Sequence, residues 1–127
     1  MQESLGTPLR RVDHELVTAL GWSLDILDEP WHDRPGLASA WLVSVTGSRT
    51  GIFVDETDDE EVRTVSLAGQ VQDFVHEDLP ARGQTAVWPG CPLHPATHPL
   101  SPTLHEGQAW WECPRTRRPV RPLGEGD

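Results

Sequence analysis

The chain has 127 residues, 36% of them hydrophobic, and a formal net charge of −10 with no lysine. This length fits one domain with a small appendage. The absence of lysine excludes lysine nucleophiles, Schiff bases and the lysine of a phosphate-binding loop. No apolar run approaches the roughly 20 residues of a membrane helix, and Glu3 precedes any basic or apolar region, so we expect a cytoplasmic protein without a membrane segment.

The first predicted element is a helix over residues 8–20. Thr7 resembles a helix cap and Pro8 fits the first helical position, where the missing N–H of proline costs nothing. Gly21 can supply the left-handed residue that ends the helix. Apolar residues follow at helical spacing, namely Leu9, Val12, Leu16 and Leu20.

Strands are predicted next. Residues 22–27 alternate between apolar and polar side chains, which is typical of a half-buried strand. Residues 39–55 indicate a hairpin with its turn at residues 47–51 and residues 52–55 as the returning strand. We expect Trp41, Val43 and Val45 to share one face of this hairpin.

The acidic run at residues 55–61 precedes an amphipathic segment and predicts a second helix over residues 59–79. Acids in a first turn complement the positive end of a helix, so we interpret the run as a helix entrance. It lacks the glycine and the closing acid of a calcium loop. The predicted apolar stripe contains Val62, Val65, Ala68, Val71 or Gln72, Val75 and Leu79.

The carboxy-terminal part is rich in proline and predicts a smaller hairpin, residues 100–105 against 108–113, with Glu106 and Gly107 in the turn. An arginine- and proline-rich tail follows, and we expect its last residues to fray. The whole order predicts an α+β fold, in which an antiparallel sheet carries two helices on one face. We expect an acidic body over residues 1–88 and a ribbon-like hairpin module, with the tail, over residues 89–127, packed on that body.

Two Cys-Pro dipeptides frame this module, Cys91-Pro-Leu-His94 and Cys113-Pro-Arg-Thr116. The segment resembles a zinc ribbon, in which two knuckles around a hairpin each offer a pair of ligands. The chain departs from that pattern at Thr116, because threonine does not hold structural zinc. His98 could replace it, so the resemblance implies a structural zinc held by Cys91, His94, His98 and Cys113, with His105 in reserve.

Two other interpretations of the module stay open. It could be a proline-stiffened lid without metal, packed by Trp88, Trp110 and Trp111. Alternatively, Cys91 and Cys113 could form a disulfide or a redox pair, although an intracellular setting disfavours this.

The tail places Arg115, Arg117, Arg118 and Arg121 together on an otherwise acidic protein. They could contact phosphate or dock an acidic partner. Alternatively, they pair with carboxylates of the same chain, for example with the acidic run.

The remaining histidines give weaker signals. His14 and His76 are flanked by acids, but neighbours on a helix do not face one another, so exposed polar faces are expected. His32 and Asp33 lie in a loop that could hold a small molecule. Cys91 lies between Gly90 and Pro92 with no sign of a helix start, so we do not expect a nucleophile there.

We therefore expect a non-enzymatic binding or regulatory protein, such as an immunity-type inhibitor or an adaptor, with a basic protein as partner. A uniformly acidic surface repels phosphate backbones and disfavours duplex nucleic acid. Two alternatives remain, a nucleic-acid-associated ribbon that uses the four tail arginines and a metal-dependent hydrolase that uses the carboxy-terminal histidines.

Overall fold

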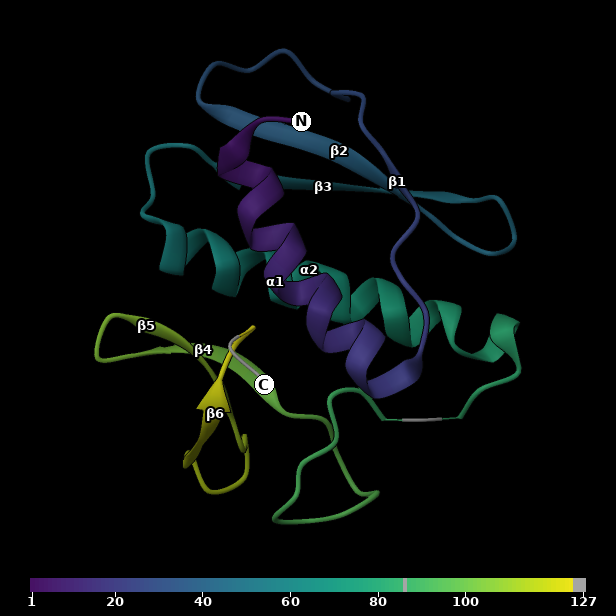
Figure 1. Cartoon of the computed structure of the whole chain (residues 1–127), viewed down its shortest axis with the longest axis vertical. Coiled ribbons are helices and arrows are strands. Elements are labelled where there is room, and N and C mark those ends of the chain that lie inside the picture. The colour runs from purple at the N-terminus through teal and green to yellow at the C-terminus, as the bar shows by residue number, and fades with distance from the viewer. Residues whose placement is uncertain (86, 125–127) are drawn as a thin grey trace.

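A computed structural model describes residues 1–85 and 87–124 of the chain. Within these residues, two α-helices and two antiparallel three-stranded sheets make up the fold, so the predicted α+β class is confirmed (Figure 1). Helix α2 lies between the sheets and contacts β3 on one side and β4 and β5 on the other. In chain order the elements are α1 (Glu3–Leu20), β1 (Ile26–Leu27), β2 (Leu37–Val43), β3 (Arg49–Asp55), α2 (Glu60–Asp78), a 3-10 turn (Pro80–Arg82), β4 (Ser101–His105), β5 (Gln108–Glu112) and β6 (Pro119–Pro122).

Helix α1 begins at Glu3, so the predicted start at Pro8 is wrong. A proline inside a helix removes the N–H that would bond the carbonyl four residues earlier, which here belongs to Ser4. The Ser4 carbonyl instead accepts a 2.6 Å hydrogen bond from Arg63 of α2. Helix α1 therefore runs through Pro8 because a neighbouring side chain replaces the lost donor. It ends before Gly21, as predicted.

The first sheet has the order β1-β2-β3, and the predicted hairpin is confirmed. Its turn lies at residues 44–48 and not at the predicted residues 47–51, because β3 already begins at Arg49 and Gly51 pairs with Trp41. The strand predicted over residues 22–27 forms only at its end, in β1. Trp41 and Val43 share one face of β2, as predicted, whereas Val45 lies in the turn after the strand and is exposed. The buried face is the opposite one, which carries Ala40 and Leu42. Apolar residues occupy both faces of β2, and the smaller ones face the helices.

The free edge of β3 is covered by a side chain of α2. The Phe53 N–H donates to Gln70 Oε1 at 3.0 Å, and Gln70 Nε2 donates to the Phe53 carbonyl at 2.8 Å. The Gln70 amide therefore occupies the place that a further strand would take.

Helix α2 begins at Glu60, and the Asp59 carboxylate accepts a 3.0 Å hydrogen bond from the Val62 N–H. The interpretation of the acidic run as a helix entrance is thus confirmed. The buried face of α2 contains more polar side chains than the predicted stripe, because Thr64, Gln72 and Asp78 are all buried.

The second sheet has the order β4-β5-β6. Its first hairpin is confirmed, with Glu106 and Gly107 at φ values of 52° and 78°, as a two-residue turn of this type requires. Part of the tail forms β6 against β5, and Leu123 is fully buried, which the sequence did not predict. The expected fraying concerns residues 125–127, which lie outside the described residues.

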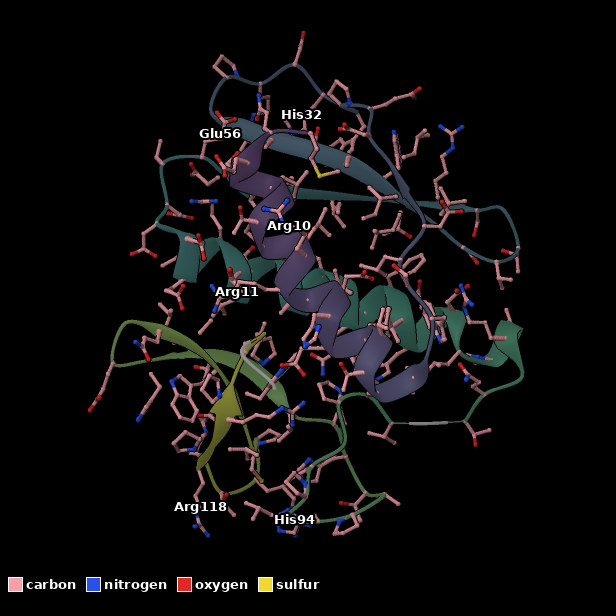
Figure 2. The ribbon with its side chains drawn as sticks, viewed as in Figure 1. Arg10, Arg11, His32, Glu56, His94 and Arg118 are labelled. Carbon is pink, nitrogen blue, oxygen red and sulfur yellow. The ribbon has the colours of Figure 1, made fainter. Side chains whose placement is uncertain are left out.

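Arg11 of α1 joins the two parts of the fold (Figure 2). Its guanidinium donates to Glu61 of α2 at 2.7 Å and to the Leu123 carbonyl at 3.0 Å. The Glu61 carboxylate also accepts from the Ala109 N–H of β5 at 3.0 Å. One buried core includes residues from both helices and both sheets, while the proposed boundary at residue 88 stays a prediction.

Candidate metal centre

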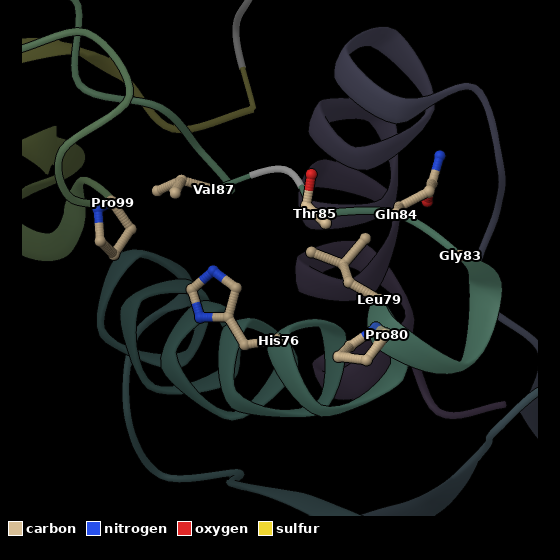
Figure 3. A pocket seen from close by; sticks show the side chains of 8 residues that line it. All are labelled: His76, Leu79, Pro80, Gly83, Gln84, Thr85, Val87 and Pro99. Carbon is tan, nitrogen blue, oxygen red and sulfur yellow. The ribbon is translucent and has the colours of Figure 1, made fainter.

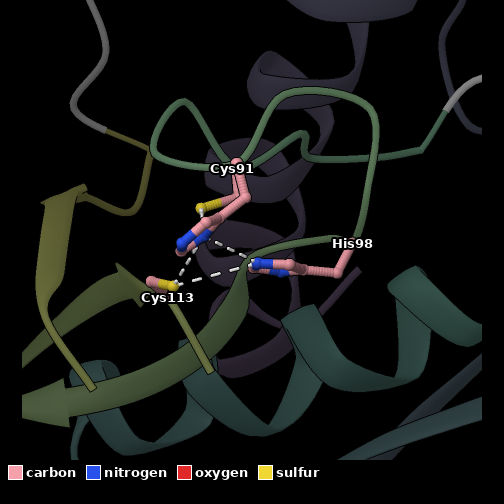
Figure 4. A group of neighbouring side chains, drawn as sticks. Cys91, His98 and Cys113 are labelled. Atoms are coloured by element: carbon pink, nitrogen blue, oxygen red, sulfur yellow. Dashed lines mark hydrogen bonds between the residues drawn. The ribbon is translucent and has the colours of Figure 1, made fainter. Parts of the chain in front are cut away.

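The four predicted ligands come from two separate segments that the fold brings together. Cys91, His94 and His98 lie in the loop between the 3-10 turn and β4, and Cys113 directly follows β5. Their ligand atoms all lie within 4.8 Å of one another, and both cysteines are free and buried (Figure 4). A Cys91–Cys113 disulfide is therefore not formed in this structure.

Several distances between these atoms are close to those around a tetrahedral ion. His94 Nδ1 lies 3.8 Å from Cys91 Sγ and 3.6 Å from Cys113 Sγ, and His98 Nε2 lies 3.9 Å from Cys113 Sγ. The two imidazole nitrogens are 3.1 Å apart. With Zn–S of about 2.3 Å and Zn–N of about 2.0 Å, a tetrahedron separates sulfur from nitrogen by about 3.5 Å and two nitrogens by about 3.3 Å. The arrangement is thus compatible with a zinc site.

The hydrogen bond of His98 to the backbone determines which ring nitrogen can bind a metal. Its Nδ1 lies 3.0 Å from the carbonyl oxygen of Pro99. A carbonyl can only accept, so Nδ1 carries the proton and the lone pair of the neutral ring is on Nε2, which faces His94 Nδ1 and Cys113 Sγ. Such an outer contact fixes the tautomer and the orientation of a metal-binding histidine.

Thr116 occupies the knuckle position where the zinc-ribbon pattern would have a fourth ligand, and it acts through hydrogen bonds. Burial opposes ionisation of the Cys113 thiol. Hydrogen bonds from the Thr116 hydroxyl and from the N–H groups of Thr116 and Arg115 nevertheless lower the pKa of Cys113 to about 6. A thiol with this pKa is largely thiolate at neutral pH, which is the form that binds metals. The sequence did not predict this role.

The ligand loop is held at both ends by α2. Gln72 Nε2 donates to the Leu100 carbonyl at 2.6 Å and to the Trp88 carbonyl at 3.3 Å. The loop is closed by a 2.8 Å hydrogen bond from the Leu100 N–H to the Pro89 carbonyl. Sequence reasoning placed Gln72 only as an alternative to Val71 in an apolar stripe, because nothing in the local pattern indicates which backbone it meets.

The tryptophans predicted to pack the module divide into two groups. Trp88 and Trp111 are buried and meet edge to face, with ring centroids 5.9 Å apart. Trp110 instead packs against His105 near the hairpin turn. His105, the reserve ligand, is exposed and is not part of the cluster.

The four tail arginines do not behave as one group. Arg115, Arg117 and Arg118 are exposed and form no ion pair within residues 1–85 and 87–124. Arg121 instead donates to Glu15 of α1 at 2.8 Å. The acidic run has a different partner from the one suggested, since Arg11 binds Glu60 and Glu61. The predicted binding patch stays a prediction.

The other histidines lie apart from the cluster. His14 is exposed, as expected, whereas His76 is half-buried and lines a largely apolar pocket of about 620 Å³ with Leu79, Val87 and Pro99 (Figure 3). His76 Nε2 accepts a 3.3 Å hydrogen bond from the Trp88 N–H. That lone pair is used, so His76 holds its proton on Nδ1 and is not placed as a base.

No protein-family model matches the sequence, and comparisons with curated proteins and with solved structures likewise return no match. Among the described residues, neither α1 nor α2 combines the length and the hydropathy needed to cross a membrane.

Proposed function

We propose that this chain is a non-enzymatic binding protein whose carboxy-terminal sheet is stapled by a structural zinc ion. The convergence of Cys91, His94, His98 and Cys113, whose ligand atoms lie within 4.8 Å of one another, carries the proposal. Two thiolates balance the charge of Zn²⁺ and two neutral imidazoles complete the set, which suits a site with both sulfurs buried.

The number of ligands favours a structural role over the alternative of a metal-dependent hydrolase. A hydrolytic zinc site keeps one position for the water that it activates. Four protein ligands fill a tetrahedron. The ion would link the loop before β4 to the end of β5, and metal binding would then contribute to folding.

Metal analysis of the protein purified without added metal tests this proposal. We expect about one zinc per chain, since a tetrahedral set holds one ion, and its loss in Cys91→Ser, Cys113→Ser and His98→Ala. His105→Ala is the matched control and should retain the metal, because His105 lies outside the cluster. Absence of zinc, together with unchanged melting temperatures in both cysteine variants, would contradict the proposed structural zinc.

The partner that we propose is a protein with a basic surface, as for an immunity-type inhibitor or an adaptor. The formal net charge of −10 supports this, because long-range attraction steers a basic partner toward an acidic protein. A pull-down at physiological salt tests it. Retention of no basic protein at that salt would contradict the proposal.

A second candidate function is nucleic-acid association through the tail. Arg115, Arg117 and Arg118 favour it, because they are exposed and unpaired among the described residues. Binding would then weaken with salt and be lost when these arginines are changed to glutamate, whereas Arg121→Glu would mainly disturb the contact with Glu15.

A further inference from the structure

The outer face of the first sheet carries three aromatic side chains, Trp31, Trp41 and Phe53, which we call the aromatic platform. The ring of Trp31 lies 6.2 Å from that of Trp41 and 6.1 Å from that of Phe53. Trp31 is 39% exposed and Phe53 is 41% exposed. A sheet face in contact with water normally carries polar side chains, so a group of exposed aromatic rings there is a candidate interaction site.

The platform is fixed in place without a partner. The Trp31 backbone N–H donates to Ser39 Oγ at 3.2 Å, and Trp31 Nε1 donates to the Ile52 carbonyl at 3.0 Å. The indole lies directly over Gly51, where a Cβ atom would approach Nε1 to 2.9 Å. Because Trp31 is already ordered, a partner that contacts it loses little side-chain entropy of this protein.

Acidic side chains lie at the Phe53 end of the platform, and a resident arginine covers Trp41 at the other end. The Arg49 guanidinium already lies over Trp41, 5.9 Å from the ring centroid, in the geometry of a cation–π contact. Asp55 shares the strand face of Phe53 by alternation, and hydrogen bonds from Thr57 lower its pKa, so it stays ionised. Glu56 follows in the turn after β3 and is exposed, at the end of the molecule opposite His94 (Figure 2).

We propose that the aromatic platform binds an arginine-bearing segment of a basic protein, with guanidinium groups stacked on Trp31 and Phe53 and paired with Asp55 and Glu56. This rests on the proposed function, for which it names the surface and the recognised side chain. Arginine is preferred over lysine because its planar guanidinium stacks on aromatic faces and binds carboxylates through two hydrogen bonds.

Two labelled peptides test the proposal by fluorescence anisotropy at physiological and at doubled salt. One alternates arginine with glycine and the other alternates lysine with glycine, so they carry equal charge. We expect the arginine peptide to bind more tightly, and Phe53→Ala or Trp31→Ala to weaken it by about threefold to tenfold. Leu104→Ala is the matched control, since Leu104 is 42% exposed but lies on β4 of the other sheet.

A further variant separates stacking from simple apolar contact and guards against misfolding. Phe53→Leu keeps an apolar side chain without a π face, and it should lose as much affinity as Phe53→Ala. Parent-like binding by both Phe53 variants would overturn the platform and leave the basic partner standing. If neither peptide binds, both the aromatic platform and the basic partner are contradicted. Preferential binding of single-stranded oligothymidylate, lost in Phe53→Ala, would overturn the choice of partner.

Discussion

The Gln72 side chain of α2 donates a 2.6 Å hydrogen bond to the Leu100 carbonyl, on the strand side of the ligand loop. Its second hydrogen bond reaches the Trp88 carbonyl at the other end of that loop. A buried helix residue therefore fixes the position of three of the four candidate ligands, although α2 contributes none of them.

Gln72→Leu should lower the free energy of unfolding by about 1–3 kcal/mol, because it leaves a buried carbonyl without its donor. The Leu100 carbonyl is the one most affected. Urea unfolding measures the loss, and chelator competition should show weaker zinc binding in the variant. Gln70→Leu is the control, since its contacts lie at an exposed strand edge where water can replace the amide. An equal or larger loss in Gln70→Leu would contradict this account.

Removal of the proposed zinc by a strong chelator should lower the melting temperature of the parent protein, because the metal would link the loop before β4 to the end of β5. The near-ultraviolet circular dichroism should change as well, since Trp88 and Trp111 pack against each other beside this loop. Cys113→Ser should already show the lower melting temperature and respond no further to chelator. A chelator response of equal size in both proteins would assign the effect to another site.

We expect the Asp78 carboxylate to stabilise the fold in a way that is lost in acid. Burial raises its pKa, but hydrogen bonds from Ser44, Arg82 and the Val45 N–H lower it below its ordinary value. The stabilisation is therefore complete above the unfolded pKa of about 3.9 and is lost as the pH falls through the lower folded pKa.

Asp78→Asn should thus be less stable than the parent at pH 7, and the difference between the two should shrink as the pH falls toward about 3. Urea unfolding of both proteins at each pH measures this difference, and release of the proposed zinc at low pH would affect both alike. A difference in stability that grows as the pH falls would contradict a lowered pKa of Asp78 in the folded protein. Asp73→Asn, at an exposed position on the same helix, serves as the control.

Gly124→Ala should destabilise the protein by more than backbone strain alone. Gly124 has φ of 77°, and a Cβ atom there would lie 2.6 Å from Arg11 Cβ and 3.0 Å from its backbone. Gly107→Ala is a matched control, because Gly107 has φ of 78° but open space around it. Strain costs about 1–3 kcal/mol in either variant, so the excess in Gly124→Ala measures the clash. Equal melting temperatures of the Gly124→Ala and Gly107→Ala variants would show that Arg11 can move away from the added Cβ atom at little cost.

Much of the site could be predicted because its signals are local. The spacing of Cys91 and His94 indicates a knuckle, and the glycine turn before β5 indicates the hairpin that brings Cys113 close. The boundaries of α2 could also be predicted from the sequence, because the acidic run precedes the helix and Pro80 follows it.

The parts that could not be predicted depend on contacts distant in sequence. Helix α1 starts before Pro8 because Arg63, far along the chain, supplies a donor to Ser4. Strand β6 begins and ends with a proline, which is typical of an irregular tail, and only its pairing with β5 identifies it as a strand. The facing of β2 was ambiguous because both of its faces carry apolar side chains, and the packing of the helices decides which face is buried.

The hydrogen bonds between the Gln70 amide of α2 and the edge of β3 also affect self-association. An unprotected edge strand is a template on which a second molecule can add its own strand and begin to polymerise. At Phe53 both backbone groups are already engaged by Gln70. Another copy cannot extend the sheet through this point without first displacing that amide, so the protein can display aromatic rings beside the edge strand and still resist fibril growth there.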